Sequence, residues 1–212
     1  MVSISGIEYQ KELEQLPYFN KNEAAVVIGK RGKNLDKKIA RLSKIGYLKT
    51  IKKGLYVSAV YADSESGESY MQFVANILRS PSYISTEYVM AREGLIPESV
   101  YWITSITIKS SRKYSNFLGN YSYRNIKKSL FLGFEEKNWN NNIIYIASKA
   151  KALFDYFYLK STYNIKADVY DTRINWDNFS KDGLLEFEKY VMLSKSIKMN
   201  NILKAIKKYY VS

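Results

Sequence analysis

The chain has 212 residues, with 33 Lys and Arg against 20 Asp and Glu, so its formal net charge is +13. This excess of positive charge indicates a polyanionic partner, nucleic acid before an anionic membrane surface. The chain contains no cysteine and no histidine, which excludes disulfides, thiolate and imidazole metal ligands, and Ser-His or Cys-His catalysis.

Two helices are predicted at the start of the chain. Residues 7–16 form the first, which a following proline ends. Asn20 and Glu23 have the spacing of a capping box, with Asn in place of Ser or Thr. They open a second helix over residues 24–28, and residues 29–32 form the turn after it.

A third, basic helix is predicted over residues 35–45. Its apolar side chains recur at steps of four and three residues, which makes one helical stripe, and they are Leu35, Ile39, Leu42 and Ile45. The opposite face would meet water or a ligand and carries Lys37, Ala40, Arg41 and Lys44. Gly46 follows, where a left-handed residue ends a helix.

A basic hairpin follows, with strands at residues 47–51 and 55–57 around a Lys-Lys-Gly turn. The order helix, helix, turn, helix, hairpin predicts a winged helix-turn-helix over residues 1–60. These residues hold 12 basic and 5 acidic side chains, so the charge is concentrated at the front of the chain. The alternative is a three-helix bundle with solvated lysines.

The winged-helix interpretation gives the basic residues separate roles on double-stranded DNA. Lys37 and Arg41 would face base edges in the major groove, with Ala40 able to touch a thymine methyl. Positive side chains on the turn and the wing would hold phosphates and set register. The other predicted DNA contacts are Arg31, Lys33, Asn34, Lys38, Lys44, Lys49, Lys52 and Lys53.

The remainder of the chain predicts a linker and a larger mixed α+β domain that ends in helices. Residues 61–69 are acidic and rich in Ser and Gly, so we expect a linker there. The domain would span residues 70–212. Helices are expected at 70–78, 85–92, 149–160 and twice near the C-terminus, and strands at 102–108, 117–123, 130–134 and 143–146.

Catalytic chemistry has little support in the sequence. The segment 29–32 is too short for a phosphate-binding loop and lacks its Lys-Ser/Thr. The carboxylates of residues 135 and 136, and those of Asp168 and Asp171, could bind magnesium in principle. Scattered acids such as these are usually solvated. Asp155, inside an apolar helix, is expected to cap a loop or pair with a lysine. We therefore expect no enzyme activity, no cofactor and no metal.

The sequence also gives expectations about membrane spans and the cellular compartment. The longest apolar runs are far too short to span a bilayer, and the N-terminus lacks the basic-then-apolar layout of a signal peptide. We expect a cytoplasmic protein with no membrane partner.

With the whole chain laid out, it resembles the AbiEi family of abortive-infection antitoxins and transcriptional regulators. The resemblance rests on the order and spacing of four motifs along the chain. These are GLYV at 54–57, SPSYISTEYVMAREGLIPE at 80–98, WITSITI at 102–108 and SKAKALFDYFY at 148–158.

This resemblance implies a repressor that binds its own promoter, with inverted repeats, through the winged helix. It also implies that the C-terminal domain counters a nucleotidyltransferase-like toxin in phage defence, with or without direct contact. Two alternatives stay open. One is a plain transcription factor whose second domain senses a ligand or dimerises, and the other is a metal-dependent nuclease with its own DNA-binding module.

Overall fold

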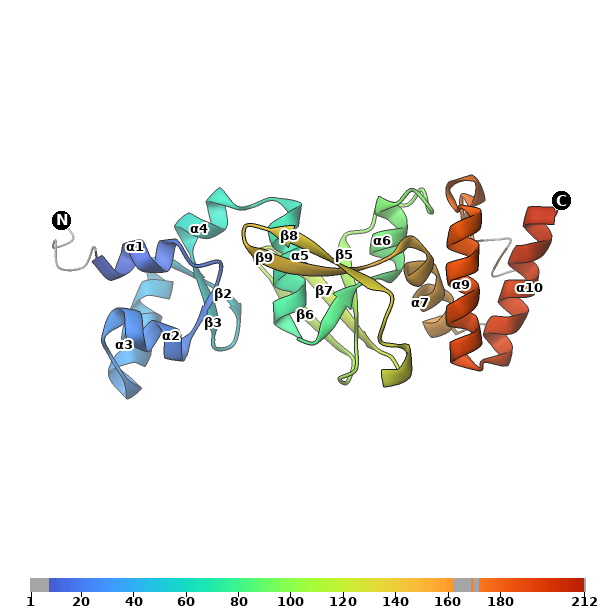
Figure 1. Ribbon diagram of the computed structural model, residues 1–212. Coiled ribbons are helices and arrows are strands. Elements are labelled where there is room, and N and C mark those ends of the chain that lie inside the picture. The colour runs from blue at the N-terminus through green and yellow to red at the C-terminus, as the bar shows by residue number, and fades with distance from the viewer. Residues whose placement is uncertain (1–7, 162–168, 170–171, 212) are drawn as a thin grey trace. The chain divides into compact units, whose positions relative to one another are not determined.

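The computed structural model describes residues 8–161, residue 169 and residues 172–211, and it mixes helices and strands (Figure 1). The α+β class predicted from the sequence is confirmed. The chain divides into two compact units, which are described separately. Unit 1 comprises residues 1–74 and 114–119, and unit 2 comprises residues 75–113 and 120–212.

Unit 1 begins with three helices and a hairpin, in the order predicted. The elements are α1 (Glu8–Glu14), β1 (Phe19–Asn20), α2 (Lys21–Ile28), α3 (Gly32–Lys44), β2 (Leu48–Lys52) and β3 (Leu55–Ser58). The strands form an antiparallel sheet in the order β1-β3-β2. Gly54, at a φ of 81°, supplies the left-handed residue that the β2–β3 turn needs. The two-residue strand β1 was not predicted, because so short a segment carries no periodicity.

The core of unit 1 joins these helices to the sheet. Leu13 of α1 and Phe19 of β1 are completely buried. The apolar stripe of α3 packs into the same cluster, and its remaining buried members are Ala24, Leu35, Ile39, Leu42 and Leu48.

The predicted linker at 61–69 is wrong in its structure and its boundaries. Helix α4 (Ala59–Ser64) occupies its first half, and the Ser58 side chain caps that helix by accepting from the Tyr61 N–H. Helix α5 (Glu68–Leu78) begins before the predicted linker ends. Tyr70 is completely buried, and its hydroxyl donates to the Pro17 carbonyl at 2.8 Å. Unit 1 therefore extends past the linker into α5.

A mixed six-stranded sheet has the strand order β6-β7-β5-β4-β9-β8, and it belongs to unit 2 except for residues 114–116 of β6 and Gly119 of β7, which are part of unit 1. Its strands are β4 (Ser82–Ile84), β5 (Trp102–Thr107), β6 (Arg112–Asn116), β7 (Gly119–Asn125), β8 (Phe134–Trp139) and β9 (Asn142–Ala147). Strand β4 runs antiparallel to β5 and parallel to β9. Strands β5 and β7 are parallel, and β8 and β9 are antiparallel.

The helices of unit 2 follow the predicted pattern closely. They are α6 (Thr86–Arg92), α7 (Lys149–Leu159), α9 (Lys181–Ser194) and α10 (Ile197–Val211), with short 3-10 turns η2 (Lys128–Leu130) and η3 (Trp176–Asn178). Helix α7 packs against α6, α9 and α10. Its inner side chains Leu153, Phe154 and Phe157 are completely buried.

The sheet of unit 2 departs from the prediction at its edges and at the central strand β4, which was not predicted because a three-residue segment carries no periodicity. Strands β6 and β8 were not predicted, because most of their residues are exposed and polar and give no alternating apolar pattern. The predicted strand at 130–134 is wrong. Leu130 instead ends η2, residues 131–133 form an irregular connection with Gly133 at a φ of 78°, and β8 begins at Phe134. The rings of Phe131 and Phe134 pack on Tyr83.

Candidate nucleic-acid interface

Helix α2 and the turn after it fix where α3 begins. Asn20 accepts hydrogen bonds from the N–H groups of residues 22 and 23, and the Glu23 side chain accepts from the Asn20 N–H at 2.6 Å. The predicted capping box is therefore confirmed. Gly29 ends α2 in the left-handed conformation, and its N–H donates to the Ala25 carbonyl.

The inner face of α3 is confirmed at three of its four predicted positions. Leu35, Ile39 and Leu42 are buried, whereas Ile45 is 66% exposed. The correction at Ile45 has a simple cause: the helix ends at Lys44, and Ile45 is its C-cap, so its side chain leaves the stripe. Gly46 follows at a φ of 76°, as predicted.

The outer face of α3 is basic and open to solvent. The exposed side chains on it are Lys33, Asn34, Lys37, Ala40, Arg41 and Lys44. The only acid of the helix, Asp36, lies beside them and is bound by Lys21 at 2.5 Å. This hydrogen bond raises the pKa of Lys21 above its ordinary value. Because Lys21 offsets the charge of Asp36, the remaining charged side chains on the outer face are all positive.

Lys38 lies at the border between the two faces. It is half-buried, and its ammonium lies 5.3 Å from the centre of the Tyr9 ring on α1. Such a cation–π contact restrains the side chain while leaving its charge available. Lys38 is therefore a peripheral member of the basic face.

The hairpin carries its basic residues in three different settings. Lys53, in the turn, is exposed, and Lys52 is half-buried. Lys49 on β2 forms an ion pair with Asp63 of α4, and its ammonium lies 5.2 Å from the Phe117 ring centre. The sequence predicted Lys49 as a DNA contact, and the structure shows it paired with an acid in the free protein.

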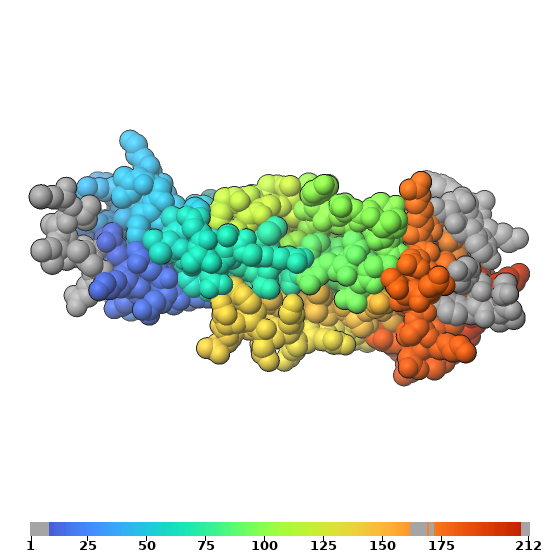
Figure 2. Space-filling view, turned by 90° about the horizontal axis from the view of Figure 1, so that it is seen from above, coloured from blue at the N-terminus to red at the C-terminus, as the bar shows by residue number. Residues whose placement is uncertain are grey.

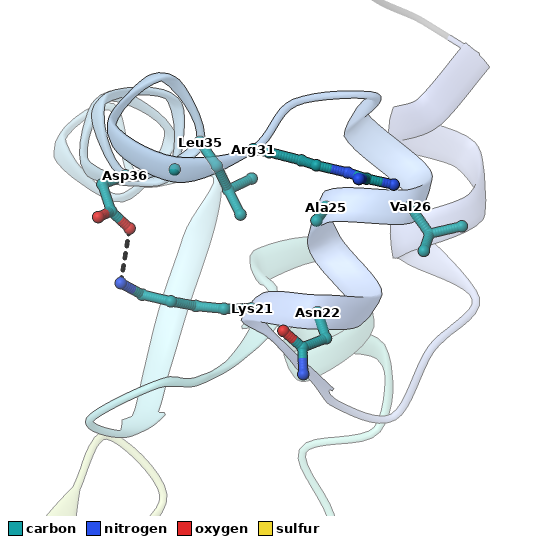
Figure 3. A pocket seen from close by; sticks show the side chains of 8 residues that line it. Lys21, Asn22, Ala25, Val26, Arg31, Leu35 and Asp36 are labelled. Atoms are coloured by element: carbon teal, nitrogen blue, oxygen red, sulfur yellow. Dashed lines mark hydrogen bonds and ion pairs between the residues drawn. The ribbon is translucent and has the colours of Figure 1, made fainter.

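A hollow of about 550 Å³ lies between α2 and the start of α3 (Figure 3). Lys21 and Asp36 line one side of it, and the Arg31 side chain extends over α2 towards Val26. Val26 is 83% exposed, an unusual position for an apolar side chain. The hollow brings Arg31, a predicted phosphate contact, beside residues that the sequence did not single out, and no periodic pattern marks Val26.

The structure gives little support to the other candidate sites. Asp168 and Asp171 lie outside the described residues. Across the part of the chain that the structure describes, no three Asp or Glu side chains come together as a metal site would require. None of the described helices is long and apolar enough to cross a bilayer.

Comparison with models of known protein families finds no match for this chain. A search of curated proteins finds no matching relative. The basic face of α3, the hairpin and the hollow are therefore interpreted from their own chemistry.

Proposed function

We propose that the protein is a DNA-binding transcriptional repressor. Unit 1 would act as a winged helix-turn-helix, with α3 as the recognition helix and the β2–β3 hairpin as the wing. The observation that carries this proposal is the amphipathic character of α3. Its inner face is fixed in the core by Leu35, Ile39 and Leu42, so its basic outer face is turned to solvent.

The dimensions and chemistry of α3 suit the major groove of DNA. A helix of 13 residues is about 20 Å long, and the major groove is about 12 Å wide and admits one helix. Arg41 and Lys37 lie one turn apart on the outer face, where each could reach a base edge. Lys53 on the hairpin and Arg31 before α3 would hold phosphates, which contribute affinity without sequence information.

The test is a mobility shift on the DNA upstream of the protein's own gene, repeated over a series of salt concentrations. Arg41→Ala should cost roughly 1–3 kcal/mol on the specific site and relax base preference there. Lys53→Ala should weaken binding to all sequences alike and lower the salt slope by about one. Lys128→Ala, an exposed lysine of unit 2, is the matched control.

Unchanged specific binding by Arg41→Ala would remove the recognition role from α3. Equal losses for Arg41→Ala and Lys128→Ala would reduce the effect to net charge alone. Either result would contradict the proposed interface.

We further propose that the same protein acts as an antitoxin, on the resemblance to the AbiEi family. Two of the motifs that carry the resemblance contact each other in unit 2. Tyr83 and Ser85 of the first donate hydrogen bonds to Asp155 of the second, at 2.9 and 2.8 Å. This contact gives the paired motifs a shared structural role in the domain that would counter the toxin.

The antitoxin role is tested by rescue with the full-length chain under an unrelated promoter. The adjacent gene should be toxic when expressed alone, and the protein should protect the cells. A variant with both Lys37→Ala and Arg41→Ala should lose DNA binding and still protect. A harmless neighbouring gene, or a failure of the wild-type chain to protect, would leave only the repressor.

A further inference from the structure

Helix α9 has one face that is committed to the core of unit 2. Phe187 and Val191 are completely buried, and Tyr190 is nearly so. The ring of Phe154 on α7 lies 6.2 Å from that of Phe187 and 5.7 Å from that of Tyr190. Figure 1 shows α9 beside α7 and α10, which cover this side of it.

The opposite face of α9 is apolar although it is open to solvent. Leu185 is 59% exposed, Met192 65% and Leu193 53%. Leu185 and Met192 are seven residues apart, so they lie on the same side of the helix two turns from each other. A surface helix ordinarily places polar residues there. Figure 2 shows α9, in orange, at the molecular surface.

Charged side chains of opposite sign stand at the two ends of this apolar stripe. Leu185 and Met192 are equally far along α9 from a midpoint between residues 188 and 189, and so are Asp182, in the first turn, and Lys195, the C-cap. An acid and a base therefore lie at equal distances from the midpoint of the stripe, whereas Glu188 is already paired with Lys207 of α10.

We propose that a second copy of this chain covers this face, with α9 packed antiparallel against α9 of its partner. In this arrangement Leu185 of one copy meets Met192 of the other, and Asp182 meets Lys195. A two-fold interface uses the same patch on both subunits and must be self-complementary. The order of acid, apolar, apolar and base along α9 meets that requirement.

A contact made by one helix from each subunit is small. Standard interfaces bury about 800 Å² per partner, which a single pair of helices does not reach. The dimer is therefore weak and assembles at raised protein concentration. On DNA with two sites, binding of both copies would raise their effective concentration and favour the same contact. The dimer itself does not rest on the proposed DNA binding.

The test measures the molecular mass of the full-length chain by sedimentation over a wide concentration range. Asp182→Lys and Lys195→Asp should each weaken self-association, by roughly tenfold. The variant that carries both changes restores an opposite-charge pair between the two copies. It should therefore recover self-association. Aspartate suits position 195, where φ is 51°.

Met192→Asp places an acid opposite Leu185 and should abolish the dimer. Tyr101→Asp, at a side chain that is 84% exposed elsewhere in unit 2, is the matched control and should leave it intact. All the changed residues are exposed, and circular dichroism checks that each variant remains folded. The proposal is overturned by a monomer at every concentration or by a dimer that Met192→Asp does not affect. A double charge reversal that fails to restore association also overturns it.

Discussion

Lys151 and Asp155 form an ion pair at 2.6 Å in which both side chains are completely buried. Lys151 also donates to the Leu130 carbonyl at 3.0 Å, and Asp155 accepts from Tyr83 and Ser85. Burial lowers the pKa of Lys151 and raises that of Asp155, while the opposite charge of each partner acts against both shifts. The pair is tolerable inside unit 2 because so many hydrogen bonds surround it.

Removing one partner of this pair should be far more damaging than removing both. Asp155→Leu leaves a buried ammonium without its counter-charge and should cost about 3–5 kcal/mol in the free energy of unfolding. Lys151→Met should be similarly harmful. The double variant should cost clearly less than the sum of the two, since neither buried charge remains. Urea unfolding of all four chains gives the coupling energy.

The exposed pair between Lys207 and Glu188, at 2.7 Å, provides the comparison. Lys207→Met should cost no more than about 1 kcal/mol, because solvent screens such a pair. Strict additivity at Lys151 and Asp155 would show that the two residues contribute independently.

Two buried tyrosines of unit 2 should respond in opposite ways to loss of the hydroxyl. Tyr83 donates to Asp155 at 2.9 Å, so Tyr83→Phe should destabilise by about 1.5–3 kcal/mol. The Tyr121 hydroxyl is buried and has no hydrogen-bond partner among the described residues. Tyr121→Phe should therefore be neutral or slightly stabilising. Thermal unfolding of the two variants measures the difference, and equal losses would contradict the assigned partners.

The sequence predicts the helices of this chain well because their signals are local. The capping box of Asn20 and Glu23, the stripe of α3 and the left-handed Gly46 each depend on a few neighbouring residues. The exposure of Arg41 and Lys37 follows from helical periodicity alone. These features needed no knowledge of the rest of the chain.

The features that were missed depend on distant contacts. Strands β6 and β8 are edge strands with polar faces, so only pairing with β7 and β9 identifies them. The pairing of Lys49 with Asp63 joins β2 to a helix where a linker was expected. The ion pair of Asp155 with Lys151 confirms the predicted pairing with a lysine. Its other two partners, Tyr83 of β4 and Ser85 just after that strand, lie about 70 residues earlier in the chain, and no local pattern can indicate them.

Stability should fall at alkaline pH because several tyrosines keep their protons in the folded chain. Burial raises the pKa of Tyr47, Tyr83, Tyr121 and Tyr190 above the ordinary value of 10.0. Above about pH 10 the unfolded chain releases these protons and the folded chain does not, so stability falls as the pH rises. Each such tyrosine contributes up to about 1.4 kcal/mol per pH unit.

Absorbance of tyrosinate and circular dichroism, followed together against pH, test this expectation. A part of the tyrosine signal should appear only in the step where the secondary structure is lost. Tyr121→Phe should reduce by one the number of protons released in that unfolding step, so the step should be less steep. Complete ionisation near pH 10 with the fold intact would contradict the assigned burial.

The last prediction concerns Lys49 and Lys53, and it rests on the proposed DNA binding. Lys49 is held by Asp63, whereas Lys53 is exposed in the hairpin turn. Lys53→Ala should therefore lower DNA affinity and the salt slope more than Lys49→Ala does. Asp63→Asn should release Lys49 and raise the affinity for DNA. Fluorescence anisotropy of labelled DNA over a salt series measures the affinity of all three variants.

The matched control for Asp63→Asn is Glu98→Gln, which removes one negative charge from an exposed position in unit 2. If the two variants raise affinity equally, the gain comes from net charge and not from the release of Lys49. If Lys49→Ala is as costly as Lys53→Ala, Lys49 must leave Asp63 for a phosphate when DNA binds. In that case the ion pair with Asp63 holds Lys49 only in the free protein, and DNA binding must break this pair before Lys49 of β2 can contact a phosphate.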